Sequence, residues 1–152
     1  MEEYTVKSKS PEETEKVGAS LAGKLLSENP GELCFVLLEG DVGAGKTAFC
    51  RGFSSVISPK SRVKSPSYTI VNEYRRGEVP LFHFDLYRLG EDADLSDIGF
   101  SEYVKTGHCI IEWSEYLDSE LLPGNAVRVH IQKDGETERT ITVSLVKERS
   151  GT

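Results

Sequence analysis

The chain has 152 residues and carries 25 acidic against 18 basic side chains, which gives a formal net charge of −7. Its length fits a single domain, and a composition of 38% hydrophobic and 28% charged residues is typical of a globular protein rather than of a disordered or membrane-embedded one. The negative charge argues against a broad nucleic-acid-binding face, which would be basic, but it leaves room for a small anion in a local pocket.

The first predicted elements are a helix and a buried strand. Ser10 is a good helix N-cap, Pro11 suits the first helical position, and Glu13 completes a capping box. Apolar residues then recur along one stripe until the Asn-Pro-Gly sequence at residues 29–31 ends the helix. The uninterrupted apolar run at residues 33–38 predicts a strand covered on both faces, as in a parallel sheet.

A glycine-rich turn at residues 40–45 follows this strand and leads into a predicted helix over residues 46–57. Apolar stretches at residues 68–71 and 81–84 then predict two strands, whose short connection favours an antiparallel hairpin. His83 points to the sheet face opposite Phe82 and Phe84, and we expect it to be a structural histidine.

The acidic residues 91–97 predict a loop or a short helix, and residues 108–111 predict another buried strand. The last unit is a hairpin of two alternating strands on either side of residues 134–135. A two-residue turn there would place apolar and polar residues on one face. Pairing Ile131 with Ile141 and Val129 with Val143 instead requires a turn of odd length or a bulge, and we predict that register.

These elements predict an α/β fold with a mixed sheet like that of the P-loop NTPases, with central parallel strands, antiparallel hairpins and flanking helices. We expect one domain over residues 1–147 and a tail at residues 148–152. Three cysteines without a C-x-x-C pair indicate neither a disulfide framework nor a zinc site. No apolar run approaches the roughly 20 residues that cross a bilayer, and the polar N-terminus is not a secretory signal. We therefore expect a cytoplasmic protein without a membrane partner.

The sequence GDVGAGKT at residues 40–47 matches the phosphate-binding pattern G-x-x-x-x-G-K-S/T. Glycines let the backbone wrap around an anion so that successive N–H groups converge on phosphate oxygens, and the following helix adds the positive end of its dipole. Lys46 is expected to reach the β- and γ-phosphates, and the Thr47 hydroxyl to bind Mg²⁺. The predicted nucleotide-binding residues are Gly40, Asp41, Val42, Gly43, Ala44, Gly45, Lys46 and Thr47.

A phosphate loop also needs a second carboxylate near the metal ion, and two predicted strand ends offer one. Glu112 follows the strand at residues 108–111, and Asp85 follows the strand at residues 81–84. Both would lie at the sheet edge that holds the phosphate loop, because ligands gather at the carboxyl ends of parallel strands. These considerations leave open which acid is the ligand. The guanine motif N-K-x-D and the switch motif D-x-x-G do not occur in the sequence, which favours ATP over GTP.

Four blocks of sequence, GDVGAGKT, KSPSYTIVNEY, HFDLYRL and IEWSEYL, occur in an order and spacing that resemble the TsaE (YjeE) family. The resemblance covers about residues 10–145. It implies that Thr47 and Glu112 are magnesium ligands, that Asp85 is a catalytically required acid, and that residues 64–74 behave like a switch near the γ-phosphate. It also implies that adenine lies near Thr14 and the C-terminal hairpin turn, and it matches Trp113 to a tryptophan of the family.

The resemblance implies a bacterial ATPase that uses ATP and Mg²⁺ and assists the TsaB and TsaD proteins, whose complex transfers a threonylcarbamoyl group to adenosine in tRNA. Contact with tRNA would then be indirect, through that complex. In the expected reaction water attacks the γ-phosphorus in line, Lys46 stabilises the departing charge and Asp85 orients the water. No arginine finger is evident in the sequence, so we expect slow hydrolysis by the chain alone and activation by a partner. The alternative is a small-molecule P-loop kinase, although the chain offers no arginine-rich lid.

Overall fold

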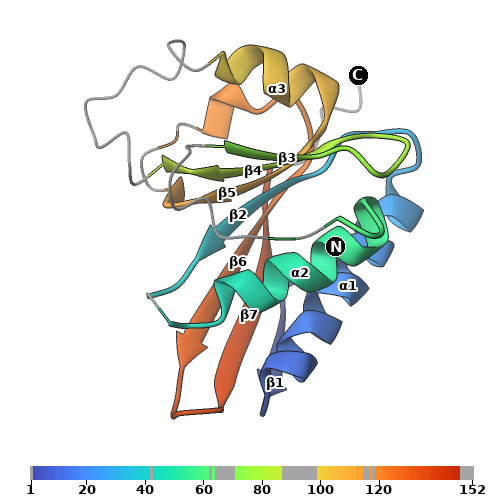
Figure 1. Cartoon of the computed structure of the whole chain (residues 1–152). Helices are drawn as coiled ribbons and strands as arrows, with labels where there is room; N and C mark the ends of the chain where they lie inside the picture. The colour runs from blue at the N-terminus through green and yellow to red at the C-terminus, as the bar shows by residue number, and fades with distance from the viewer. Residues whose placement is uncertain are drawn as a thin grey trace.

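The computed structural model describes residues 2–41, 43–61, 63, 71–86, 99–114, 117 and 119–147. A seven-stranded sheet forms its centre, in the order β1-β7-β6-β2-β5-β4-β3 (Figure 1). The strands are β1 (Tyr4–Ser8), β2 (Phe35–Glu39), β3 (Val71–Tyr74), β4 (Leu81–Asp85), β5 (His108–Glu112), β6 (Ala126–Lys133) and β7 (Arg139–Lys147). The helical elements are α1 (Pro11–Glu28), α2 (Lys46–Ile57), α3 (Phe100–Thr106) and the short 3-10 turn η4 (Ser119–Leu121).

The sheet is mixed, and its parallel part lies in the middle. Strand β2 pairs in parallel with β5 and β6, and β5 pairs in parallel with β4. The outer pairs β1–β7, β6–β7 and β3–β4 are antiparallel. This arrangement confirms the predicted fold class. Because β4, β5, β2 and β6 run in the same direction, their carboxyl ends lie at one edge of the sheet.

Helices cover the sheet on both faces, with α1 and α2 on one side and α3 on the other (Figure 1). Alternate residues of β2 point to the two layers: Val36 and Leu38 belong to the core under α1 and α2, whereas Phe35 and Leu37 belong to the core under α3. Burial on both faces explains why this strand reads as an unbroken apolar run. Among the residues described, no helix combines the length and the apolarity needed to cross a membrane.

Helix α1 begins as the sequence predicts. The Ser10 side chain accepts a hydrogen bond from the Glu13 N–H, and Pro11 occupies the first turn. The return bond of the capping box is shifted by one residue, because the Glu13 carboxylate accepts from the N–H of Lys9 instead of Ser10. This bond still satisfies a backbone donor just before the helix.

The C-terminal hairpin has the register that its apolar pattern predicts. Ile131 pairs with Ile141 and Val129 with Val143, and all four side chains are buried. The turn spans residues 134–138, and its odd length keeps the apolar residues in phase. The one irregularity in the ladder lies far from the turn, between Ala126 and Val127.

Other elements differ from the prediction. Of the predicted strand at residues 68–71, only Val71 belongs to the described part of the chain, and there it is the first residue of β3. The sequence does not predict β1, whose short pattern is half polar, or α3, which is only seven residues long. The acidic residues 91–97 and the tail at 148–152 also lie outside the described residues.

Candidate functional site

The glycine-rich turn joins the end of β2 to the start of α2, as the phosphate-loop pattern requires (Figure 1). Gly43 and Gly45 have φ values of 83° and 105°, which glycine adopts far more readily than other residues. Gly45 is the N-cap of α2, and the N–H of Ala44 donates to the Asp41 carbonyl at 2.9 Å. Val42, the remaining variable position of the loop, lies outside the described residues.

Lys46 lies against the end of β5. It is the first residue of α2, and its Nζ is 3.5 Å from Oε1 of Glu112, the last residue of β5. The same ammonium lies 5.1 Å from the centroid of the Trp113 ring, which is within cation–π range. Lys46 and Glu112 meet because β2 and β5 are neighbouring parallel strands with Leu38 opposite Glu112. The fold therefore joins the phosphate loop to a strand-end carboxylate.

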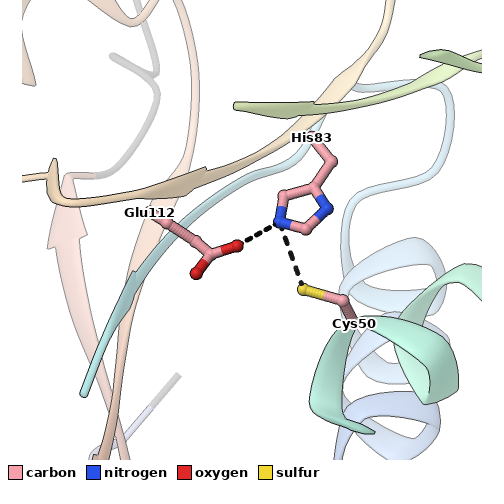
Figure 2. A group of neighbouring side chains, drawn as sticks. All are labelled: Cys50, His83 and Glu112. Atoms are coloured by element: carbon pink, nitrogen blue, oxygen red, sulfur yellow. Dashed lines mark hydrogen bonds and ion pairs between the residues drawn. The ribbon is translucent and has the colours of Figure 1, made fainter. Parts of the chain in front are cut away.

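A buried histidine holds the other oxygen of this carboxylate. Nε2 of His83 lies 2.5 Å from Oε2 of Glu112 and 3.7 Å from Sγ of Cys50, as Figure 2 shows. His83 comes from β4, Glu112 from β5 and Cys50 from α2, and all three residues are buried. Nδ1 of His83 is buried and has no hydrogen-bond partner among the described residues. His83 therefore turns its one bonded nitrogen toward the carboxylate that faces Lys46.

The electrostatics of this cluster favour an ionised Glu112. Burial alone would lower the pKa of His83, but the charge and hydrogen bonding of Cys50 and Glu112 raise it well above its ordinary value. Burial opposes ionisation of Glu112, yet the hydrogen bond and charge of His83 and the charge of Lys46 hold the pKa of this carboxyl below its ordinary value. Both shifts favour Nε2 of His83 as the donor and the carboxylate of Glu112 as the acceptor.

Asp85 lies at the same edge of the sheet. It ends β4, and the register of the β4–β5 pair places it opposite Glu112. The side chain is half-buried. The two carboxylates that the sequence offers as alternatives are therefore both present, on adjacent parallel strands, next to the loop that carries Lys46.

Two threonines expected at the site also lie near the loop. Thr47 is partly buried in the first turn of α2, directly after Lys46. Thr14 is buried in α1, and a Cβ built on Gly45 would lie 3.8 Å from Cγ2 of Thr14. The Thr14 hydroxyl is 2.8 Å from Oγ of Ser8, so this hydroxyl is already used in packing β1 against α1.

Sequence reasoning missed three side chains at this edge. His83 contacts the acid and Cys50 contacts His83, both from the α2 face of the sheet, and no spacing in the sequence connects the three residues. Arg139, at the start of β7, donates from Nε to the Ala44 carbonyl at 2.8 Å. It lies on a hairpin far along the chain from the phosphate loop, so only the paired order of the strands reveals the contact. The predicted face of His83 is confirmed, since Phe82 and Phe84 pack under α3.

The oxygen donors at this edge fit a hard divalent cation such as Mg²⁺. Glu112 supplies an ionised carboxylate, and Thr47 supplies a hydroxyl at the start of the neighbouring helix. Ligand atoms of Cys50, His83 and Glu112 also lie within 4.8 Å of one another. That set includes sulfur and nitrogen, which Mg²⁺ avoids, so the cluster does not fit this ion as a whole: His83 holds the carboxylate, and Cys50 lies against the histidine ring.

Comparison with known proteins gives a consistent result. The family model for TsaE, threonylcarbamoyl adenosine biosynthesis protein, matches residues 8–141. The tRNA threonylcarbamoyladenosine biosynthesis protein TsaE of Bacillus subtilis (strain 168) is 37% identical over 140 residues, which cover 91% of this chain and 84% of that protein. The protein of the same name from Treponema pallidum (strain Nichols) is 36% identical over 138 residues, or 90% of this chain and 97% of the relative. The crystal structure of Bacillus subtilis YdiB superposes with a TM-score of 0.74 and 31% identity, covering 96% of this chain and 87% of that one.

Proposed function

The chain belongs to the TsaE family of tRNA threonylcarbamoyladenosine biosynthesis proteins, and from this premise we propose that it is a magnesium-dependent ATPase of that process. The observation that carries the proposal is the 3.5 Å contact between Lys46 of the phosphate loop and Glu112 at the end of β5. A lysine that reaches phosphates and an acid that holds a metal ion must be adjacent in such a site. Lys46 and Glu112 come from two separate elements and are nevertheless in contact, which supports the proposal.

The phosphate loop would bind the triphosphate of ATP. Its glycines adopt left-handed conformations, and α2 begins at Lys46, so the loop is built to present backbone N–H groups at a helix N-terminus. Lys46 would exchange its contact with Glu112 for the β- and γ-phosphates. The adenine would lie beside Thr14 and the turn of the β6–β7 hairpin. The closeness of Thr14 and Arg139 to Gly45 supports this placement.

Thr47 and Glu112 would hold Mg²⁺, which, when bound, neutralises charge that develops on the phosphate oxygens. His83 would keep the Glu112 carboxylate ionised and oriented. Asp85, opposite Glu112 in the β4–β5 register, would orient the water that attacks the γ-phosphorus. The proposed switch segment at residues 64–74 is described only from Val71, where β3 begins.

The proposed partners are the TsaB and TsaD proteins, with tRNA bound by their complex rather than by this chain. The net charge of −7 supports indirect contact with tRNA, because direct binding of tRNA phosphates would favour a basic surface. ATP hydrolysis by the chain would support turnover of the complex. A partner that supplies an arginine to the γ-phosphate accelerates such reactions about 10³- to 10⁵-fold, so the isolated chain would be slow.

The test is the release of inorganic phosphate from ATP by the purified chain, with and without TsaB and TsaD, at several Mg²⁺ concentrations. We expect slow, Mg²⁺-dependent release that the two partners accelerate and that Lys46→Ala abolishes. Equal rates with and without partners would contradict partner activation. Transfer of the labelled γ-phosphate to an organic acceptor would instead identify a small-molecule kinase.

A further inference from the structure

Arg139 joins the C-terminal hairpin to the phosphate loop. It is the first residue of β7, directly after the turn at residues 134–138. Its guanidinium donates to five backbone carbonyls: those of Gly43 (3.1 Å), Ala44 (2.8 Å), Gly135 (2.7 Å), Glu136 (3.3 Å) and Glu138 (2.8 Å).

These five bonds use every N–H of the side chain. A guanidinium carries five donors in a rigid plane, and here two reach the phosphate loop while three reach the hairpin turn. A lysine has the same charge but three donors on a flexible stem, so it cannot bridge both segments in this way. The contact is therefore specific to the shape of arginine as well as to its charge.

The hydrogen bonds from Arg139 constrain the phosphate loop at positions where glycine allows many backbone conformations. Gly43 and Gly45 both have positive φ, and glycine has the least conformational preference of any residue. All described peptide bonds are trans, so the C=O and N–H of one peptide unit point in opposite directions. By holding the Ala44 carbonyl, Arg139 turns the N–H of Gly45 away from the hairpin. The orientation of that donor then does not have to be set by the ligand.

We propose that Arg139 is a positioning residue of the phosphate-binding site, one that pre-organises the loop for a nucleoside di- or triphosphate without touching it. This inference rests on the proposed nucleotide-binding function. A pre-organised loop loses less conformational freedom on binding, so the nucleotide binds more tightly. Arg139 also makes the hairpin turn a structural part of the phosphate site.

The test measures the affinity for MgADP by isothermal titration calorimetry in four proteins: the parent chain, Arg139→Ala, Arg139→Lys and Arg128→Ala. Arg128 is the matched control, because it lies on the adjacent strand β6 and bonds to Glu39 at 2.7 Å instead of to the loop. Two lost hydrogen bonds to the loop predict a loss of about 10-fold or more in both Arg139 variants. We expect Arg128→Ala to stay within about twofold of the parent chain.

A second readout does not depend on nucleotide. The backbone amide of Gly45 should exchange with solvent faster in ligand-free Arg139→Lys than in the parent chain. Added guanidinium at millimolar concentration should restore part of the MgADP affinity of Arg139→Ala, whereas sodium at equal ionic strength should not. Circular dichroism establishes whether each variant is folded. If Arg139→Ala is not folded, the comparison of Arg139→Lys with the parent chain decides the test.

Parent-like affinity in Arg139→Lys would overturn the proposal, because charge alone would then suffice. Unchanged exchange at Gly45 would overturn it as well. A parent chain that does not bind MgADP would refute the proposed function instead. The exchange experiment would still test whether Arg139 holds the loop in one conformation.

Discussion

The ammonium of Lys46 and the carboxylate of Glu112 are paired 3.5 Å apart, with side chains only 12% and 10% exposed. A buried charge that loses its partner is strongly unfavourable. The two groups that are proposed to act on phosphate and metal therefore neutralise each other in this structure. In the proposed function, nucleotide and cation would separate the two groups on binding, and each group would gain a new opposite charge.

We expect Lys46→Met to abolish MgATP binding and to lower the free energy of unfolding by about 2 kcal/mol, because Glu112 would be left with His83 alone. Adding Glu112→Gln should recover part of that stability, since the buried carboxylate that has lost its lysine partner is then removed. Urea denaturation of the two single variants and the double variant measures the coupling. Strictly additive losses would show that the pair is not coupled.

Asp85→Asn and Glu112→Gln should affect different steps. Asp85→Asn is expected to keep MgATP affinity and lose roughly 10²- to 10⁴-fold in turnover, as for a group that orients a reacting water. Glu112→Gln should instead raise the Mg²⁺ concentration needed for half-maximal turnover. Nucleotide titrations combined with phosphate-release assays separate the two effects. A common loss of nucleotide binding in both variants would contradict the separate roles.

The Asp85→Asn variant also separates hydrolysis from nucleotide binding. If tRNA modification continues normally with this variant, nucleotide binding alone suffices for the process.

His83 should matter through the position of Glu112. His83→Leu removes the donor to Oε2, and loss of such a supporting hydrogen bond costs about 10-fold or more in metal affinity. His83→Gln, whose amide can donate from a similar position, should retain more of the affinity. Magnesium titrations of turnover compare the two variants with Cys50→Ala, which leaves the bond between His83 and Glu112 in place. Equal affinities for Leu and Gln would contradict the role.

His108 should make stability depend on pH. Its Nδ1 accepts the N–H of Cys34 at 2.9 Å, which requires a neutral ring, and burial lowers its pKa. In the unfolded chain the pKa of a histidine is about 6.5. At that pH the ring of His108 is still mostly neutral in the folded protein, because its pKa there is lower. The stabilisation is therefore complete above about pH 6.5 and is lost as the pH falls through the lowered pKa of the folded state.

The matched variant is His108→Asn, whose side-chain oxygen can still accept from Cys34. We expect its unfolding free energy, measured by urea denaturation, to fall less than that of the parent chain between neutral and mildly acidic pH. Identical pH dependence in the two proteins would assign the effect to other groups.

Gly52 tests the contact between α1 and α2, and Gly23 serves as the control. A Cβ at Gly52 would lie 1.8 Å from the Glu15 carbonyl oxygen, so Gly52→Ala forces the helices apart and should cost about 1–3 kcal/mol. Gly23, also helical, has nothing within 4 Å of its added Cβ, so Gly23→Ala should stabilise the protein by roughly 0.5–1 kcal/mol. Thermal unfolding of both variants shows whether the close approach of the two helices at Gly52 is the cause of the lost stability.

The sequence predicts the elements whose local signals agree with their environment. Ser10 and Pro11 mark the start of α1, and the phosphate-loop pattern marks the start of α2. The C-terminal register follows from a single requirement, that Val129 and Val143 share one buried face. In each case the residues that carry the signal lie next to each other in the chain or are joined by one turn.

The missed features depend on strand order, which the local pattern does not contain. Cys50 reaches His83 only because α2 covers the face of β4. Arg139 reaches Ala44 only because β7, β6 and β2 are successive strands of the sheet. Strand β1 has a weak pattern of its own and is ordered by pairing with β7. Tertiary pairing, rather than local propensity, decides these contacts.

Trp113 gives the molecule an intrinsic optical reporter. It is the one tryptophan in the sequence, and its ring lies over the Lys46 ammonium. Indole emission under selective excitation therefore arises from a single place beside the phosphate loop. Any ligand that draws the lysine away from the ring changes the environment of that fluorophore, so occupancy of the loop can be followed in real time without a label.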